Sequence, residues 1–278
     1  MRRALWINLV GVNMVAGLVA GLLLLPELYR FDTLWQIRLM VLGMPLLVAL
    51  WVWQMVGMWR GAGLEPLPSG RGNLIRAAVG TAAACLALSV ASGAGAVADM
   101  ASAALGRDTL GHYALTARAD GTLVVQGDIG FGLAARVRTA LRESPSLTRV
   151  QLDSPGGRGG EGALLARVIR EADADTVVHQ GCFSACAFAF LGGHRRSLAP
   201  GAQLGFHWRR RALDWSELEL RSQVRRAFRD AGVDNEFTAH ALAVPIEDLW
   251  IPSRRELWAA GVITSPDFDA YPIPHFRG

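Results

Sequence analysis

The chain has 278 residues, of which 51% are hydrophobic and 19% are charged, which excludes an intrinsically disordered protein. All 28 basic residues are Arg, and the chain contains no Lys. Mechanisms that depend on a lysine amine are therefore excluded, including a P-loop phosphate site, a Schiff base and a Ser–Lys dyad.

The excess of positive charge lies mainly in the N-terminal third. Residues 1–103 contain 7 Arg and 4 acidic residues, whereas residues 104–278 contain 21 Arg and 20 acidic residues. Because this surplus flanks apolar segments, it indicates an oriented membrane protein and not a nucleic-acid-binding one. The three cysteines, Cys85, Cys182 and Cys186, are too few for a disulfide scaffold or a zinc site. We expect no metal and no cofactor.

Three apolar segments are long enough to cross a membrane as helices. Residues 5–25 and 39–59 each give 21 consecutive uncharged residues, and residues 77–98 give 22; a helix needs about 20 to cross the hydrocarbon core. The third segment is rich in Ala, Gly and Ser, which drive insertion weakly. Its end resembles a signal-peptidase site, although small residues also pack membrane helices closely. We predict three spans and leave open whether the third is cleaved.

The arginines around these segments predict the topology. Arg2 and Arg3 precede the first span and three Arg lie in the 60–76 loop, against two in the 26–38 loop. Positive residues favour the cytoplasmic side, so the chain after Asp99 is expected in the periplasm of a bacterium, anchored in the inner membrane. If the third segment does not insert, this part lies in the cytoplasm instead.

From about residue 104 the pattern is typical of an α/β domain with parallel strands, so we predict a membrane anchor at 1–103 and an α/β domain at 104–278. An Asp-Gly turn is expected to join the first two strands as a hairpin. Asp214 and Glu217 resemble a capping box that opens a helix ending at Gly232. Strands are expected at 113–117, 122–127, 149–153 and 176–180, and helices at 132–144, 162–172 and 182–192.

In three segments, polar residues or glycines, whose backbone is conformationally free, lie at the ends of predicted elements. They are residues 153–157 (DSPGG), 181–186 (GCFSAC) and 204–207 (LGFH). Ligands and catalytic groups gather at strand ends in α/β sheets. Ser184 opens a predicted helix, where free N–H groups suit a nucleophile that generates an oxyanion, although Ser is also a common N-cap. His207 follows a strand soon after this serine.

The order of these segments resembles the proteolytic subunit of Clp protease, whose fold is shared with crotonases and signal peptide peptidases. The resemblance covers about residues 110–265. It implies that Ser184 is the nucleophile and His207 the general base. It also implies that the N–H groups of Gly157 and Ala185 form the oxyanion hole.

The resemblance also implies an acid that completes a Ser–His–acid triad, and the sequence identifies this residue less clearly. Asp248 matches the family best, but its spacing to Gly261 departs by about one residue from the family pattern. Glu247, or no acid at all, therefore remains open. An Asp or a Glu here could hold the tautomer of His207 and stabilise the imidazolium.

Cys182 and Cys186 bracket Ser184, and both are placed in the predicted helix at 182–192. A spacing of four inside a regular helix holds the sulfurs too far apart, and Cys is often a small buried residue. This spacing disfavours a disulfide between them, although they could form one in an oxidising compartment, and their oxidation state is left open.

The resemblance implies a membrane-anchored serine peptidase that hydrolyses peptide bonds through an acyl-enzyme. Its partners are a peptide or protein substrate and membrane lipid, with no nucleic acid, and a homo-oligomer is left open. The alternatives are an inactive scaffold or peptide-binding module with the same fold and, third, a crotonase-like enzyme acting on acyl-CoA. Signal peptide peptidases of this fold use a Ser–Lys dyad, which the lack of Lys excludes.

Overall fold

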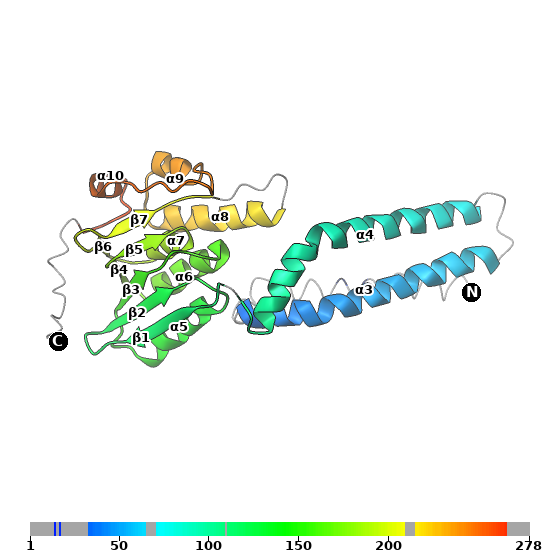
Figure 1. Ribbon diagram of the computed structural model, residues 1–278, viewed down its shortest axis with the longest axis horizontal. Helices are drawn as coiled ribbons and strands as arrows, with labels where there is room; N and C mark the ends of the chain where they lie inside the picture. The colour runs from blue at the N-terminus through cyan, green and yellow to red at the C-terminus, as the bar shows by residue number, and fades with distance from the viewer. Residues whose placement is uncertain are drawn as a thin grey trace. The chain divides into compact units, whose positions relative to one another are not determined.

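The computed structural model describes residues 14, 17, 33–64, 71–108, 110–208 and 215–265. The chain divides into two compact units, Met1–Asp108 and Thr109–Gly278, which are described separately (Figure 1). Almost all of the span predicted at 5–25 lies outside the described residues, and so does Asp214 of the predicted capping box.

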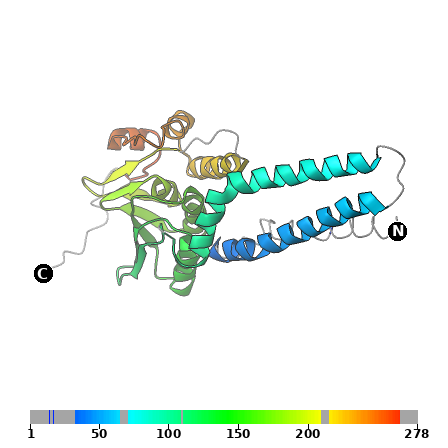
Figure 2. The ribbon, with the colours of Figure 1, turned by 45° about the vertical axis from the view of Figure 1, so that its right-hand side comes forward.

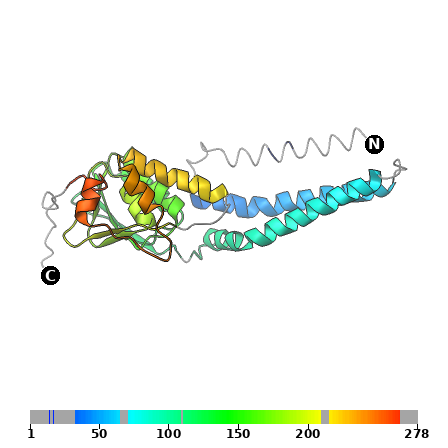
Figure 3. The same ribbon diagram turned by 90° about the horizontal axis from the view of Figure 1, so that it is seen from above.

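The N-terminal unit contains two long helices, α3 (Thr33–Leu64) and α4 (Arg71–Ala104). They run side by side (Figures 1, 2 and 3), and Arg38 Nε donates a hydrogen bond of 3.3 Å to the main-chain oxygen of Ala104. By length and composition, Thr33–Arg60 and Gly72–Ala91 could each cross a membrane. These segments overlap the second and third predicted spans. Their exposed apolar side chains include Trp35, Leu42, Leu46, Trp53, Leu74 and Leu88.

The C-terminal unit is built on a five-stranded sheet. Its strands are β1 (Tyr113–Ala117), β2 (Thr122–Gly127), β3 (Arg149–Asp153), β4 (Asp175–Val178) and β6 (Arg196–Leu198), paired in the order β1-β2-β3-β4-β6. β1 and β2 form the antiparallel hairpin that the Asp-Gly turn predicts, and the other pairs are parallel. The predicted α/β class with parallel strands is confirmed. β5 (Gly181–Phe183) and β7 (Gln203–Gly205) form a second, two-stranded parallel sheet.

The helices complete the domain core. They are α5 (Leu133–Glu143), α6 (Gly159–Glu171), α7 (Ala185–Phe190), α8 (Trp215–Asp230), α9 (Asn235–Ala241) and α10 (Arg254–Ala259). Alternate residues of β2 and β3, such as Leu123 and Val150, pack in the same core as Val137 of α5 and Ile169 of α6. Helices α8, α9 and α10 lie on the β7 side of the domain, away from β1 (Figures 1 and 2).

The helix predicted at 182–192 is wrong at its N-terminal end. Residues Gly181–Phe183 form β5, and α7 covers only Ala185–Phe190. The run of small residues there is compatible with either a strand or a helix. Pairing with β7, a segment 20 residues further on, decides in favour of the strand.

Arg196 attaches the C-terminal part of the domain to the sheet. Its side chain is buried, and its guanidinium donates hydrogen bonds of 2.8–2.9 Å to the main-chain oxygens of Gly193, Ala231, Gly261 and Val262. Burial lowers the pKa of Arg196 to about 10. Because three of the four acceptors lie beyond α8, this one side chain fixes the segment that follows α10 against β6.

Candidate active site

Ser184 occupies the turn between β5 and α7 in a strained backbone conformation. Its φ of 55° and ψ of −120° lie in a region that residues other than Gly rarely adopt. The N–H of Ser184 donates to the main-chain oxygen of Gly205 at 2.8 Å, which fixes the turn to β7. Its hydroxyl makes no capping hydrogen bond to α7. Ser184 is therefore not an ordinary N-cap, and its hydroxyl is available for other chemistry.

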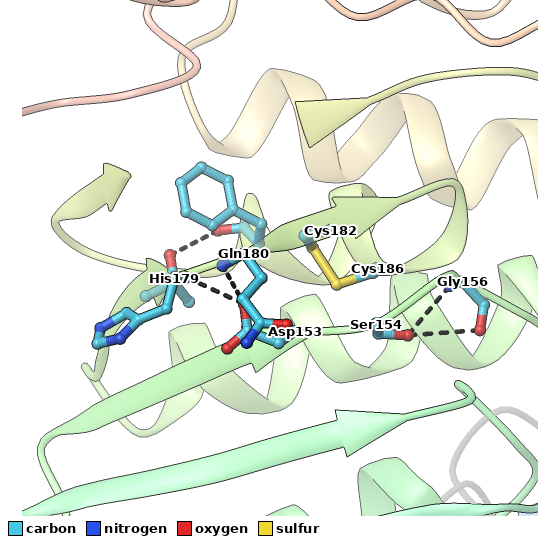
Figure 4. The surroundings of a disulfide bond; sticks show 9 residues. Asp153, Ser154, Gly156, His179, Gln180, Cys182 and Cys186 are labelled. Atoms are coloured by element: carbon cyan, nitrogen blue, oxygen red, sulfur yellow. Dashed lines mark hydrogen bonds between the residues drawn. A yellow bond between two sulfur atoms is a disulfide. The ribbon is translucent and has the colours of Figure 1, made fainter. Parts of the chain in front are cut away.

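The glycine loop after β3 lies directly against this turn. Gly156 has a φ of 109°, and a Cβ atom there would lie 2.7 Å from the main-chain oxygen of Phe183 and 2.8 Å from Cβ of Ser184. The Gly156 N–H donates to Ser154 Oγ at 3.0 Å, which closes the loop on itself (Figure 4). Glycine is needed here both for its backbone conformation and for the close approach.

Two main-chain N–H groups near Ser184 lack an acceptor in the described part of the chain. Gly157 forms a bridge with Ile129, but that bridge uses the oxygen of Gly156 and the N–H of Arg158. Its own N–H is left unused. Ala185 is the first residue of α7, so its N–H has no acceptor within the helix. These are the two donors that the resemblance implies for an oxyanion hole.

His207 lies in an extended segment whose neighbours are buried. Phe206 exchanges two main-chain hydrogen bonds with Trp250, at 2.9 and 3.0 Å, and the Trp208 N–H donates to the oxygen of Val244 at 2.8 Å. Phe206 and Trp208 are 0% and 4% exposed. Because side chains alternate along an extended strand, His207 points away from this core and is partly exposed.

The imidazole of His207 is oriented by a main-chain oxygen. Its Nδ1 lies 3.1 Å from the carbonyl oxygen of Asp248. Because a carbonyl can only accept, this bond places the proton on Nδ1 and leaves Nε2 as a proton acceptor. The carboxylate of Asp248 makes no hydrogen bond to His207 in the described structure, and neither does the hydroxyl of Ser184. The sequence could not distinguish the carbonyl of Asp248 from its carboxylate.

The carboxylate of Asp153 fixes the loop that leads into β5 (Figure 4). Its Oδ1 accepts from the N–H groups of His179 and Gln180 at 3.0 and 2.7 Å, and its Oδ2 accepts from Gln151 Nε2 at 2.7 Å. Burial is the main cause that lowers the pKa of the neighbouring His179 below 6.5. Asp153 thus has a structural role that the sequence did not reveal.

A disulfide joins Cys182 and Cys186 (Figure 4). The sequence left this pairing open, with the expectation that a helical spacing disfavours it. That expectation assumed one regular helix. Cys182 lies in β5 and Cys186 in α7, and the turn at Ser184 brings their Cα atoms to 5.2 Å. This separation is within the normal range for a disulfide.

A shallow hollow of about 370 Å³ lies next to Asp248. Its mostly apolar lining includes Ala243, Pro245, Leu249 and Trp250, with His240 beside them. Within the described ranges, no group of three or more His, Cys, Asp and Glu side chains is close enough to hold a metal ion.

No protein-family model and no curated protein sequence matches the chain. Among solved structures it is similar to a mutant of ClpP1 from Listeria monocytogenes, with 17% identity and a TM-score of 0.43, over 52% of this chain and 89% of that one. It is also similar to a mutant of the membrane-bound stomatin-specific protease 1510-N, with 15% identity and a TM-score of 0.39, over 53% of this chain and 79% of that one.

Proposed function

We propose that the chain is a membrane-anchored serine peptidase with Ser184 as nucleophile and His207 as general base. The observation that carries this proposal is the conformation of Ser184. A non-glycine residue with positive φ, at a strand-to-helix turn and against a glycine loop, is costly to maintain. Such strain persists where the surrounding structure enforces it, and it is common at catalytic positions.

The proposed reaction is acyl transfer to Ser184 and then to water. Ser184 Oγ attacks the peptide carbonyl while Nε2 of His207 takes its proton, and the N–H groups of Gly157 and Ala185 stabilise the oxyanion. His207 then gives the proton to the leaving amine. A water molecule, deprotonated by the same Nε2, hydrolyses the acyl-enzyme. The carbonyl oxygen of Asp248 holds the required tautomer throughout.

We place the catalytic unit on the periplasmic side of a bacterial inner membrane, after three spans. Two features support this location: the arginine distribution around the apolar segments, and a disulfide, which persists mainly in oxidising compartments. A fusion of alkaline phosphatase after Arg107 tests it, because that reporter folds only where disulfides form. High phosphatase activity is expected. Low activity with a bright fluorescent-protein fusion at the same point would move the domain to the cytoplasm.

An inactive scaffold that binds peptides is the second candidate. It is favoured by one observation, namely that the Ser184 hydroxyl is not hydrogen-bonded to His207 in the described structure. Catalytic hydrogen bonds are often longer without substrate, so this geometry is also compatible with an enzyme.

Casein turnover by the detergent-solubilised protein separates the two candidates. We expect turnover by the wild type and by His194→Ala, since His194 is exposed and pairs with Asp173 on the surface. His207→Ala is expected to lose activity by about 100-fold or more. Equal background rates for all three proteins would support the scaffold.

A further inference from the structure

We propose that the Cys182–Cys186 disulfide is a positioning device for Ser184, which holds the serine in its strained turn. This inference rests on the proposed peptidase function for its effect on activity, but not for its effect on structure. The two cysteines are placed symmetrically about the serine, at two residues before it and two residues after it.

The disulfide links a fixed strand to the start of a short helix. Cys182 pairs with Leu204 of β7 and forms a bridge with Ser154 at the end of β3, so its own position is firmly set. Cys186 is the second residue of α7. The covalent bond therefore sets how far the first turn of α7 can move from β5, and Ser184 is at the middle of the connected segment.

Few other hydrogen bonds hold the turn. The N–H of Ser184 bonds to Gly205, and the Phe188 N–H reaches the oxygen of Ser184 at a long distance of 3.4 Å. Helix α7 has only 6 residues, so few helical hydrogen bonds stabilise its first turn. Without the disulfide, we expect Ser184 to relax towards an ordinary N-cap conformation. That change would rotate its hydroxyl and the N–H of Ala185 together.

The effect is expected to be local. The entropy lost on closing a loop grows with loop length, and here the bonded residues are only 4 apart. Both cysteines are 0% exposed and lie in the main core, so the reduced thiols remain packed. The disulfide should therefore matter more for the geometry of the turn than for the stability of the domain.

The covalent step is a thiol–disulfide exchange. Formation passes two electrons and two protons from the two thiols to an oxidised dithiol partner, which leaves as the reduced dithiol. Reduction by dithiothreitol is the reverse: the bridge becomes two thiols, and the reagent leaves as its cyclic disulfide.

The first test establishes the bond itself. The protein is purified without reductant, denatured in SDS and alkylated, and the modified cysteines are identified by mass spectrometry. We expect modification of Cys85 alone, and of Cys182 and Cys186 only after reduction. Alkylation of all three cysteines without reductant would overturn the proposal.

The second test measures what the bond does. The rate of labelling by a fluorophosphonate, a reagent for activated serines, is compared between the wild type and Cys182→Ala/Cys186→Ala, with Cys85→Ser as matched control. We expect labelling of the double variant to be about 10-fold slower or more, with an unchanged far-UV spectrum. The control should be labelled at the wild-type rate. Reduction should slow the labelling of the wild type, and reoxidation should restore its rate. Reoxidation should not restore the labelling rate of the double variant, which cannot form the bond.

Hydrogen exchange of a peptide that covers 183–188 gives a readout independent of catalysis. Faster exchange confined to this peptide on reduction supports the positioning role, even if the oxidised wild type is never labelled and the peptidase function fails. Unchanged exchange together with an unchanged labelling rate would overturn the inference.

Discussion

The two sides of the candidate site are built in different ways. On the nucleophile side, which comprises residues 154–162 and 181–190, main chains meet so closely that a methyl group added at Gly156, Gly157 or Gly162 collides with backbone. On the base side, which comprises residues 205–208 and 244–251, the imidazole of His207 is held by one hydrogen bond, and Leu249 and Ile251 are 43% and 42% exposed. We therefore expect reactivity to depend mainly on the packing of the nucleophile side.

The largest effect is expected for Gly156→Ala. The new Cβ would contact Cβ of Ser184 and the oxygen of Phe183 at less than 3 Å, at a φ of 109°. Overpacking and backbone strain there are relieved by movement of the turn, and a displacement of Ser184 by about 1 Å should slow fluorophosphonate labelling by about 100-fold. Gly201→Ala is the matched control, because Gly201 also has a positive φ but has no atom near its Cβ position. Equal labelling rates for the two variants would show that the nucleophile side tolerates the methyl group.

The next largest effect is expected for Gly162→Ala in α6. Its Cβ would collide with the main-chain oxygen of Ala185, the residue that begins α7. We expect a loss of about 1–3 kcal/mol in the free energy of unfolding and slower labelling. Gly160→Ala, whose Cβ would lie 3.6 Å from Leu220 Cδ1, should instead be neutral or stabilising, because Ala favours a helix over Gly by about 1 kcal/mol. Thermal melts that rank the two variants the other way would contradict the packing argument.

A smaller, pH-dependent effect is expected for His179. Its pKa is lowered in the folded protein, so the folded state favours the neutral imidazole. The stability that this contributes is present above pH 6.5 and is lost as the pH falls through the lower, folded-state pKa. The melting temperature should therefore fall more between pH 7 and pH 5 in the wild type than in His179→Gln.

His194→Gln is the control for this pH effect, because its side chain is exposed. Glu219 and Glu256, whose pKa values are also lowered, titrate below 4.5 and do not contribute in this window. An equal fall of the melting temperature between pH 7 and pH 5 in the wild type and in His179→Gln would show that the burial of His179 does not lower stability at low pH.

The smallest effect is expected for Asp248→Asn. The hydrogen bond to His207 uses the main-chain oxygen of this residue, which the substitution retains. Casein turnover should change by less than about 3-fold, since no hydrogen bond to His207 is lost. Glu247→Gln tests the other acid in the same way. A loss of about 100-fold or more in either variant would mean that a carboxylate orients His207 during catalysis.

An element could be predicted from the sequence where local residues determine it, and could not where a long-range contact does. The hairpin at 113–127 and the strand at 149–153 were predictable because each is set by local alternation and a turn signal. The strand at 181–183 was not, because its pairing with β7 is a long-range contact. The disulfide could not be decided from the sequence for the same reason, since its geometry follows from where β5 ends.

The sequence predicts which residues make up the candidate site, but not how they are arranged. The sequence predicts Ser184 near the start of a helix and His207 soon after a strand, but it does not predict the strand β5 that precedes Ser184. Whether Asp248 meets His207 through its carbonyl or its carboxylate depends on the backbone path at 245–250, which no residue pattern specifies. The strain at Ser184 likewise appears only in the backbone angles.

Mass spectrometry of the fluorophosphonate-treated protein shows whether Ser184 is an activated nucleophile. We predict a single adduct on Ser184, no adduct in Ser184→Ala, and labelling slowed by about 100-fold or more in His207→Ala. An adduct on any other residue, or no adduct at all in protein whose Cys182–Cys186 disulfide is intact, would contradict the account.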